Sequence, residues 1–166
     1  MATVKTIKIN GKDVSLPTGL FINGEFVPSV SKEEFDVENP ATGEKVISIQ
    51  EGRAEDVDIA VKAARKTFKS PEWRDLPPGD RGQYLNKLAD LMEQHREEIV
   101  AIEMLDTGKT HKQADNADFP AAIGTLRYYA GWADKVLGIA SFNVPKTFGY
   151  TIREPVGVCG QIIPWK

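Results

Sequence analysis

The stretch EPVGVCGQIIPWK, Glu154 to Lys166, decides how the rest of the sequence is interpreted. From Val156 to Ile163, alternate positions fall into two sets, and both sets are apolar or small except at Gln161. This pattern is typical of a strand that is covered on both faces in a parallel sheet. Such a strand needs neighbouring strands to pair with its backbone N–H and C=O groups. We therefore expect residues 156–166 to be the first strand of a larger sheet, and the chain to be the front portion of a larger enzyme.

The composition is that of an ordinary globular protein, because 41% of the 166 residues are hydrophobic and 27% are charged. The net charge of −3 leaves no basic excess for phosphates, which argues against nucleic acid as a main partner. The single cysteine rules out an internal disulfide and suits a reducing compartment. No apolar run approaches the roughly 20 residues that span a bilayer, and residues 1–18 lack the apolar core of a signal peptide. We expect a cytoplasmic protein with neither a membrane nor a nucleic-acid partner.

The first part of the chain is predicted to be a flexible tail followed by extended segments. Residues 1–19 are mostly polar and are assigned to the tail. Asn23-Gly24 lies between apolar flanks, and this dipeptide suits the two positive-φ positions of a type I′ hairpin turn. The further elements predicted here are extended segments at residues 35–37 and 46–49, joined by a turn at residues 39–43.

Four helices are predicted in the middle of the chain, because apolar residues recur there at helical spacing. They are residues 54–69, a helix that follows Pro77-Pro78 and breaks or bends near His95, a helix that ends at Gly108, and residues 115–137, which end at Gly138. Extended segments then lead into the terminal strand.

Seven short motifs occur in a fixed order along the chain. They are FINGEF, NPATGE, WR, DRG, LDTGK, LRYYAGWADK and EPVGVCGQIIPW. Each motif alone is weak, but the ordered set runs from about Leu20 to Trp165 and is specific. The chain resembles the NAD(P)-dependent aldehyde dehydrogenase family, and most of all its tetrameric cytosolic and mitochondrial type. Members of this family continue far past the region of resemblance, with the rest of the cofactor domain and the catalytic domain.

The resemblance implies an α/β fold, the amino-terminal part of the aldehyde dehydrogenase fold, with an incomplete Rossmann-like sheet. Residues 20–137 would be the mostly helical first portion of the cofactor-binding domain. Residues 138–155 resemble the family's oligomerisation ribbon, which protrudes and pairs across a subunit interface; an ordinary internal hairpin is the alternative. Residues 156–166 would be the truncated first strand of the dinucleotide-binding sheet. The implied partner is a further copy of the chain, in a homodimer or homotetramer.

The strand that ends in Ile-Ile-Pro-Trp lines the dinucleotide site in the family. The resemblance therefore places Ile162, Ile163, Pro164 and Trp165 beside NAD, with NADP as the alternative. Two general principles support this placement of a cofactor. Ligands bind at the carboxyl ends of strands in open α/β sheets, and a tryptophan offers an apolar wall with one N–H donor. The alternative is that these four residues are simply buried core. The usual Gly-x-Gly-x-x-Gly fingerprint is absent from the sequence, and the family lacks it too.

Lys166 departs from the family, which has asparagine after Pro-Trp. In the family, the amide of that asparagine donates to the oxyanion that forms when the catalytic cysteine attacks the aldehyde. Lysine brings a mobile, hydrated cation instead, and loss of one such donor typically costs about 10²–10³ in rate. Substitution of the asparagine is one explanation for Lys166. The other explanation is an intron that begins with the bases GTAA and interrupts the asparagine codon after its first two bases. Reading through this intron would give AAG, a lysine codon, and then the stop codon TAA.

No catalytic residue is assigned to this chain, because the family's nucleophilic cysteine and general-base glutamate fall outside the region of resemblance. Cys159 lies in the predicted strand with no histidine or lysine near it in sequence to lower its pKa, so we expect a small buried residue. His95 and His111 are too far apart in sequence for a zinc site and are expected to face solvent at helix ends.

Two acidic pairs, Glu33-Glu34 and Glu97-Glu98, are expected to be solvated rather than to form an acid–base site. Asp106, together with the Val37 carbonyl, is a candidate for the monovalent-cation site that some family members have. Capping or salt bridging near the helix end is the alternative for Asp106. No other metal site is expected.

Three functions compete at this stage. In the first, the chain is part of an oxidoreductase that oxidises aldehydes to carboxylic acids. The resemblance implies that a thiolate attacks the aldehyde, hydride passes to NAD(P)⁺ and water releases the acid, and we expect the 166-residue chain alone to be inactive. In the second, the chain is a non-catalytic module that joins oligomers of full-length relatives. In the third, it is an unstable product of a mis-spliced transcript.

Overall fold

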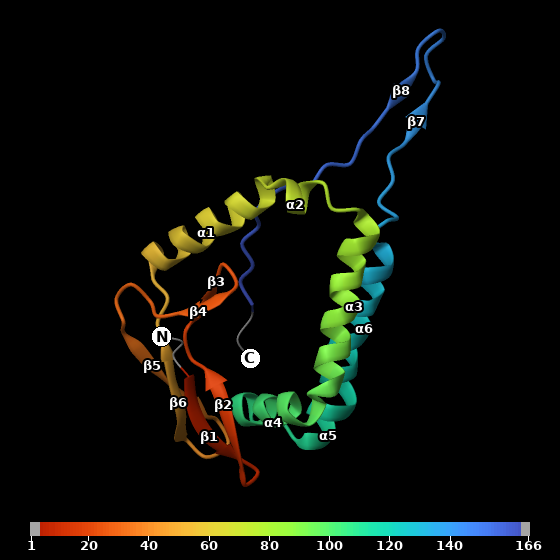
Figure 1. Cartoon of the computed structure of the whole chain (residues 1–166). Helices are drawn as coiled ribbons and strands as arrows, with labels where there is room; N and C mark the ends of the chain where they lie inside the picture. The colour runs from red at the N-terminus through yellow and green to blue at the C-terminus, as the bar shows by residue number, and fades with distance from the viewer. Residues whose placement is uncertain (1–3, 164–166) are drawn as a thin grey trace.

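The computed structural model describes residues 4–163, and its first part consists of antiparallel β-hairpins, coloured red to orange in Figure 1. The hairpins pair β1 (Val4–Ile9) with β2 (Lys12–Pro17), β3 (Leu20–Ile22) with β4 (Glu25–Val27), and β5 (Glu34–Asn39) with β6 (Glu44–Gln50). Each hairpin is its own two-stranded sheet. The two extended segments predicted around the turn at residues 39–43 are therefore confirmed.

Two of these hairpins close on an Asn-Gly dipeptide. Asn23-Gly24 has φ values of 55° and 85°, which confirms the predicted type I′ turn. Asn10-Gly11 has φ values of 50° and 80° and joins β1 to β2 in the same way. The prediction of a flexible tail over residues 1–19 is therefore wrong for residues 4–17. The overlooked signal was the earlier Asn-Gly pair, because apolar residues alternate on both sides of it.

The turn between β5 and β6 is held by Asn39. Its side-chain Oδ1 accepts a hydrogen bond from the backbone N–H of Ala41 at 2.9 Å, and its backbone oxygen accepts one from Gly43 at 2.8 Å. Gly43 has a φ of 72°, in the left-handed region that glycine enters without strain. This geometry confirms the predicted turn.

The helices follow from residue 54 onward. They are α1 (Ala54–Lys69), α2 (Pro71–Arg74), α3 (Pro78–Gln94), α4 (Arg96–Thr107), α5 (His111–Gln113), the π-helical turn η1 (Ala114–Asp118) and α6 (Phe119–Trp132). The bounds of α1, the break at His95 and the left-handed cap at Gly108, where φ is 71°, confirm the first three predicted helices. Within residues 4–163, no helix combines the length and apolarity that crossing a bilayer requires.

The fourth predicted helix differs from the structure at both ends. Its first part is the wider π-helical turn η1, and α6 ends at Trp132 rather than at Leu137. Val136 and Leu137 are exposed, so no packing supports a further turn of helix. Helices in proteins depend on such packing more than on intrinsic propensity.

A buried polar cluster fixes the start of α1. The Asp56 carboxylate accepts backbone hydrogen bonds from Val30 and Arg53, both at 2.9 Å. Beside it, the Gln50 side-chain oxygen accepts from the Ser29 backbone N–H at 3.0 Å. Acidic groups in the first turn also suit the positive end of the helix dipole. These contacts tie the third hairpin, the preceding loop and α1 into one unit.

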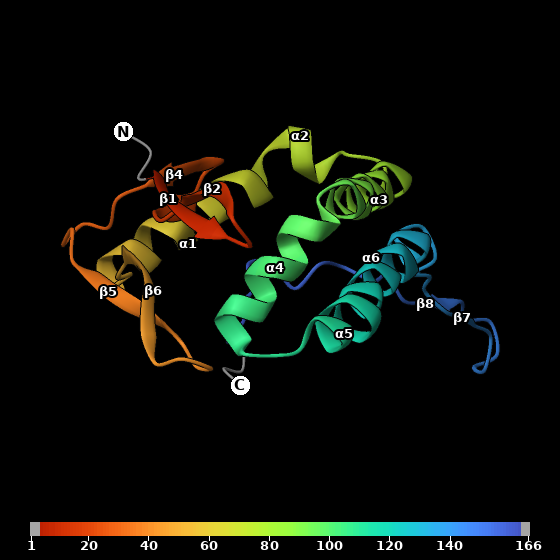
Figure 2. The same ribbon diagram turned by 90° about the horizontal axis from the view of Figure 1, so that it is seen from below.

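The compact core lies where α3, α4, η1 and α6 meet. Its buried side chains are Ala89, Val100, Ala114, Phe119 and Ile123. Elsewhere, large apolar side chains on α1, on α3 and along residues 136–152 remain exposed. Figures 1 and 2 show why, since α1, α3, α4 and the hairpins are arranged as an open frame rather than around a common centre.

Helices α3 and α6 pack antiparallel along their length and form the thickest side of this frame (Figures 1 and 2). Gly82 permits the close approach, because a Cβ at this position would lie 2.5 Å from the Ala130 carbonyl oxygen. Arg127 on α6 joins the helices at their surface, where its Nη2 donates to Asp90 at 2.8 Å and to Glu93 at 2.5 Å.

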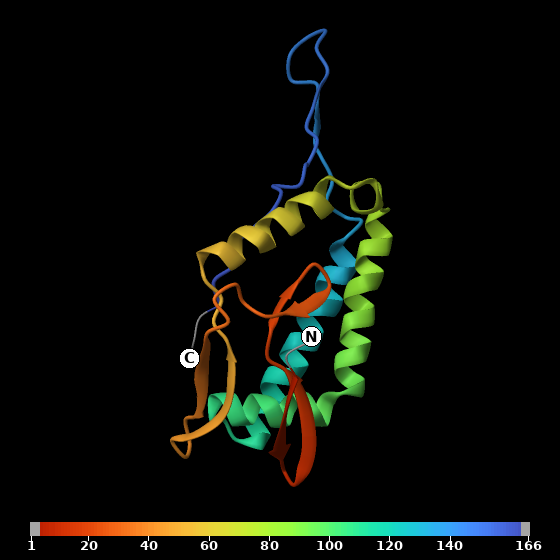
Figure 3. The same ribbon diagram turned by 60° about the vertical axis from the view of Figure 1, so that its left-hand side comes forward.

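A narrow ribbon follows α6 and extends away from the frame, as Figures 1 and 3 both show. Its paired strands are β7 (Ala140–Ser141) and β8 (Gly149–Tyr150). The Thr151 backbone N–H donates to the Ile139 carbonyl at 2.9 Å and extends the pairing toward the base. Residues 138–155 thus form a protruding antiparallel ribbon, whose role between subunits stays a prediction.

The terminal segment is not the strand that its sequence pattern predicts. None of the residues 156–163 belongs to a strand, and Val156 is 94% exposed. The physical reason is that the described part of the chain places no parallel strand beside this segment, so its backbone has no ladder to join. Residues 164–166 lie outside the described residues.

We predict that Gly82→Ala destabilises the chain by roughly 1–3 kcal/mol, because the added methyl group collides with the backbone of α6. Urea unfolding followed by far-UV circular dichroism measures this change. Gly79→Ala in the same helix is the matched control, since a Cβ there meets nothing within 4 Å. Its stability is expected to be unchanged or slightly raised. Equal effects of the two substitutions would contradict the assigned role of Gly82.

Candidate functional site

The predicted cofactor wall lies only partly within the described residues. Ile162 and Ile163 are 87% and 65% exposed, whereas Pro164 and Trp165 lie outside the described residues. The exposure of the two isoleucines follows from the lack of a covering sheet layer among the described residues, so simple buried core remains the alternative to a cofactor wall. Uncovered apolar side chains fit a flat, partly apolar ligand, because contact with it would remove their surface from water. Their contact with a cofactor stays a prediction.

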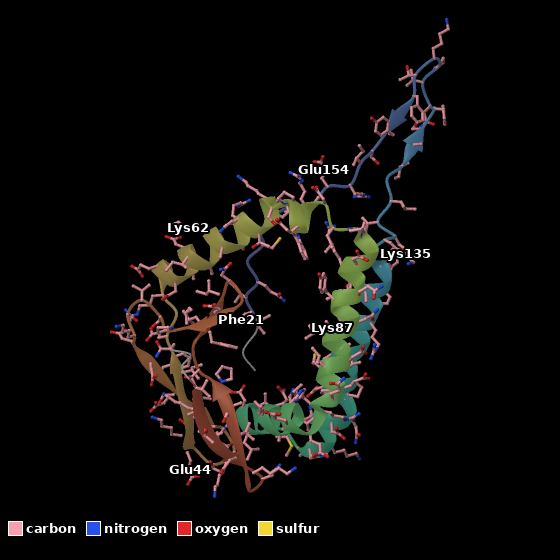
Figure 4. All side chains as sticks on the ribbon, viewed as in Figure 1. Phe21, Glu44, Lys62, Lys87, Lys135 and Glu154 are labelled. Atoms are coloured by element: carbon pink, nitrogen blue, oxygen red, sulfur yellow. The ribbon has the colours of Figure 1, made fainter. Side chains whose placement is uncertain are left out.

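The segment just before these residues packs on α1. Residues 157–159 close one side of a hollow of about 480 Å³, whose other walls are α1, Trp73 of α2 and the β3–β4 hairpin. Figure 4 labels Phe21 on that hairpin. Most of the wall is apolar, and its side chains include Phe21, Ala60, Ala64, Phe68 and Trp73. Gly157 takes a φ of 115° here, a conformation that favours glycine.

Cys159 lines this hollow with an exposed thiol, so the prediction of a buried residue is wrong for this chain. The cause is again the unpaired terminal segment, which no sheet layer covers. The Sγ donates a weak hydrogen bond to the Gly157 carbonyl oxygen at 3.6 Å. An activated nucleophile needs a base or cation within hydrogen-bond reach, and among residues 4–163 none contacts this sulfur. Cys159 therefore has no geometry for nucleophilic catalysis.

The histidines form no metal site in the described structure. His95 lies between α3 and α4 with an exposed side chain and faces Glu98 at 3.5 Å, and His111 is exposed at the start of α5. Both positions confirm the expected solvent-facing helix ends. Across residues 4–163, no group of three His, Cys, Asp or Glu side chains gathers as metal ligands would. Glu97 is 93% exposed in its side chain, as expected for a solvated acid.

The Glu34 carboxylate has protein partners, whereas the prediction was that it is solvated. Its carboxylate accepts hydrogen bonds from Lys5 Nζ at 2.6 Å and from the Gln50 side chain at 3.0 Å. The hydrogen bond from Lys5 is the main reason why the pKa of Glu34 is lowered. This residue therefore links β1 to β5 and is not part of an acid–base pair.

Asp106 lies exposed near the end of α4, and α4 packs against β5, the strand that carries Val37. The fold thus brings together the two elements that the cation-site hypothesis requires. The cation site itself stays a prediction.

Charged pairs surround the π-helical turn η1 and were not found from the sequence. Lys109 Nζ donates to Asp118 at 2.8 Å and to Glu103 at 3.4 Å, and the hydrogen bond to Asp118 is the main cause of its raised pKa. Arg96 Nε donates to Asp115 at 2.6 Å, which lowers the pKa of that carboxyl. The raised pKa of Lys109 and the lowered pKa of Asp115 both favour the charged forms, so these pairs act as structural ties rather than as proton donors or acceptors in catalysis.

Comparison with known proteins decides the family. The sequence profile described as "Aldehyde dehydrogenase family" matches residues 26–166. The chain belongs to the aldehyde dehydrogenase family. This finding confirms the resemblance carried by the seven motifs, and it accounts for the α/β fold with small, incomplete sheets.

Several relatives in the family align with nearly the whole chain. An aldehyde dehydrogenase of Alternaria alternata is 53% identical over 165 residues, which cover 99% of this chain and 33% of the relative. A mitochondrial aldehyde dehydrogenase of Mesocricetus auratus is 50% identical over 88% of this chain and 29% of its own length. The protein named "aldehyde dehydrogenase, cytosolic 1" of Mus musculus is 49% identical over 89% of this chain and 30% of its own length. The chain thus spans about a third of these relatives.

Solved structures agree with the sequence comparison. The NAD⁺ complex of aldehyde dehydrogenase from Bacillus cereus matches this aldehyde dehydrogenase family chain with a TM-score of 0.81 and 41% identity. The match covers 84% of this chain and 28% of the Bacillus chain. The arrangement of hairpins and helices described above is therefore the aldehyde dehydrogenase arrangement.

The exposed thiol gives a direct test of the terminal segment. We predict that the folded 166-residue chain reacts with an aromatic disulfide reagent at one thiol per chain, at a rate close to that of the urea-unfolded chain. Absorbance of the released thiolate measures the reaction, and Cys159→Ser is the control that removes it. A folded chain whose thiol reacts only after unfolding would show that residues 157–159 are covered.

Proposed function

We propose that this chain forms the amino-terminal part of an NAD⁺-dependent aldehyde dehydrogenase subunit, which oxidises an aldehyde to a carboxylic acid. The observation that carries the proposal is the match, with a TM-score of 0.81, to a Bacillus cereus structure that is itself an NAD⁺ complex. Identity of 53% to the Alternaria enzyme over 165 residues supports the same activity.

In this proposal, Ile162, Ile163, Pro164 and Trp165 form the wall against which the cofactor lies. Ile162 and Ile163 are exposed in this chain and so are available for that contact. When bound there, NAD⁺ would supply the hydride-accepting chemistry that aldehyde oxidation requires. The contribution of this chain would be to present an apolar wall to the cofactor and to keep water from that side. NADP is the alternative cofactor.

The ribbon at residues 138–155 is proposed to join subunits in a homodimer or homotetramer. Its rings stack along one side, with centroids 5.1 Å apart for Phe142 and Phe148 and 5.9 Å for Phe148 and Tyr150. All three side chains are exposed. Exposed contiguous apolar surface of this kind marks interaction sites. The same surface also suits the second candidate function, a non-catalytic module that joins full-length relatives.

A cytoplasmic location is proposed for the protein. The name of the mouse relative, cytosolic 1, supports it. The mitochondrial hamster relative is of similar identity, and mitochondria are therefore the alternative compartment.

We predict that the purified 166-residue chain oxidises no short aldehyde with NAD⁺ above the buffer rate. The reason is that its exposed cysteine has no activating partner and its terminal segment joins no sheet within the described residues. Absorbance of NADH measures the reaction, with full-length Alternaria enzyme as the positive control. Turnover by the chain that persists after repeated purification would contradict this prediction.

A chimera tests the proposed function itself. Residues 26–163 of this chain replace the aligned residues of the Alternaria enzyme, which keeps its own residues before and after the replaced segment. We expect NAD⁺-dependent aldehyde oxidation within about tenfold of the parent, a loss of less than about 1.4 kcal/mol in transition-state stabilisation. Because Phe148 lies on the ribbon that is proposed to join subunits, Phe148→Ser in the chimera is expected to shift its elution in size-exclusion chromatography toward smaller species. A chimera that folds and assembles but is inactive would contradict the proposal.

A further inference from the structure

A second, smaller hollow of about 250 Å³ lies beside the core, where α3, α4, η1 and α6 meet. Its floor is apolar and consists of Met92, Ile99, Val100, Ala114, Phe119 and Ala122. Ala122 is exposed and Glu103 and Asp118 are half-buried, so the hollow is open to solvent at its rim. Apolar walls hold water poorly, because a bound water molecule needs about two to four polar partners. The hollow therefore favours an occupant with an apolar body.

Two carboxylates line the hollow and share one cation. Glu103 comes from α4 and Asp118 from the end of η1. Their oxygens lie 3.4 Å and 2.8 Å from the same ammonium, Lys109 Nζ. One lysine neutralises only one carboxylate. Within the described residues, this pair therefore leaves a surplus of one negative charge beside the apolar floor.

A second cation near the hollow does not remove this surplus. The guanidinium of Arg96 lies over the Phe119 ring, 5.2 Å from its centroid. However, Arg96 Nε donates to the Asp115 carboxylate at 2.6 Å, and its Nη2 donates to the Asp115 carbonyl at 2.8 Å. Arg96 is thus already paired, and its charge is balanced by a carboxylate outside the hollow.

The energetics of the helices explain only one of the two carboxylates. Asp118 directly precedes α6, where the helix dipole favours a negative charge. Glu103 lies toward the C-terminal end of α4, where the dipole disfavours it, and Asp106 adds a like charge three residues further on. The 3.4 Å contact of Glu103 with Lys109 is also longer than the usual roughly 2.7–3.2 Å of an N–H···O hydrogen bond. The Glu103 carboxylate therefore has room for a better partner.

The π-helical turn helps to build the hollow, because its first residue, Ala114, and its last, Asp118, both line it. Turns of this kind are rare and frequently occur at functional sites. Pro120 lacks an N–H group and accounts for a break in the helix ladder. It does not account for a carboxylate at the edge of an apolar floor.

We propose that this hollow binds a small primary amine with an unbranched apolar chain, whose ammonium is held between Glu103 and Asp118. These two carboxylates already hold one ammonium, that of Lys109, so their arrangement suits a second group of the same chemistry. The apolar floor takes the chain of the ligand. At about 30 Å³ for each water-sized group, the hollow has room for roughly eight non-hydrogen atoms.

A metal ion fits this hollow less well than an amine. A calcium ion takes about six to eight oxygen ligands, whereas the floor supplies only apolar side chains. Across residues 4–163, no three His, Cys, Asp or Glu side chains come together as metal ligands would. The proposed site is separate from aldehyde oxidation and does not depend on it.

NMR titration of the ¹⁵N-labelled full chain with n-hexylamine tests the proposal. We expect saturable shifts of the backbone amides of Ala114, Asp118 and Ala122, with a Kd of about 1 mM or lower. The matched ligands are 1-hexanol and hexanoate, which keep the chain and replace the ammonium by a neutral or an anionic group. Both are expected to bind at least about tenfold more weakly. Equal binding of 1-hexanol, or hexylamine shifts confined to other residues, would overturn the proposal.

A pair of variants on α4 tests the role of the carboxylate. Glu103→Gln keeps the shape of the side chain and is expected to weaken hexylamine binding at least about tenfold. Glu97→Gln is the matched control, because it removes the same charge from the same helix at a side chain that is 93% exposed. Its binding is expected to stay within about twofold of the unmodified chain. Equal weakening by the two variants would reduce the effect to net charge and contradict the proposed site.

Lys109→Met separates ligand binding from a purely structural role of Lys109. It keeps an unbranched side chain but removes the ammonium that competes for the two carboxylates, so hexylamine is expected to bind about fivefold more tightly. Unchanged or weaker binding to the folded variant would overturn the proposal. Far-UV circular dichroism checks the fold, and the variants at Glu103 and Glu97 decide the outcome if Lys109→Met does not fold.

The source of the amine is tested with Nα-acetyl-lysine amide, which carries a primary amine on a protein-like backbone. Its bulky backbone exceeds the size of the hollow, so we expect weaker binding than that of hexylamine. Tighter binding of this probe would assign the hollow to a lysine side chain of a partner protein and would overturn the proposal of a small-molecule ligand.

Discussion

Pairing of backbone N–H and C=O groups between strands is the constraint on which the shape of this chain depends. Each described strand is paired with the strand next to it in sequence, through a turn or a short loop. Residues 156–163 have no such neighbour, since a parallel partner requires a long crossover connection. The same apolar alternation therefore produces hairpins early in the chain and an exposed, irregular segment at its end.

Packing between helices forms the compact core, which the small two-stranded sheets do not provide. The close contact at Gly82 lets α3 and α6 lie side by side, and the core around Val100 and Ile123 fills the space where α4 joins them. This pair also sets the direction of the ribbon, because α6 leads directly into it (Figure 1). The packed pair α3 and α6 thus presents the ribbon, while the apolar hollow beside α1 and the two exposed isoleucines remain uncovered within the described residues.

The local elements were predictable, and the site was predictable only in part. The Asn23-Gly24 turn, the break at His95 and the cap at Gly108 follow from backbone preferences that act within a few residues. The β1–β2 hairpin had the same kind of signal in Asn10-Gly11. Cys159 shows the limit, because its burial depends on a layer that a strand pattern implies but that residues 4–163 do not provide.

By itself, the sequence determined the Asn23-Gly24 turn, the bounds of α1, the break at His95, the family and the positions expected to face a cofactor, because these depend on residue type and short-range spacing. Only the tertiary structure decided which apolar faces are covered and how the Lys109 and Arg96 ion pairs brace the π-helical turn. Those features depend on contacts between segments far apart in the chain, and spacing along a single segment carries no information about what lies opposite it.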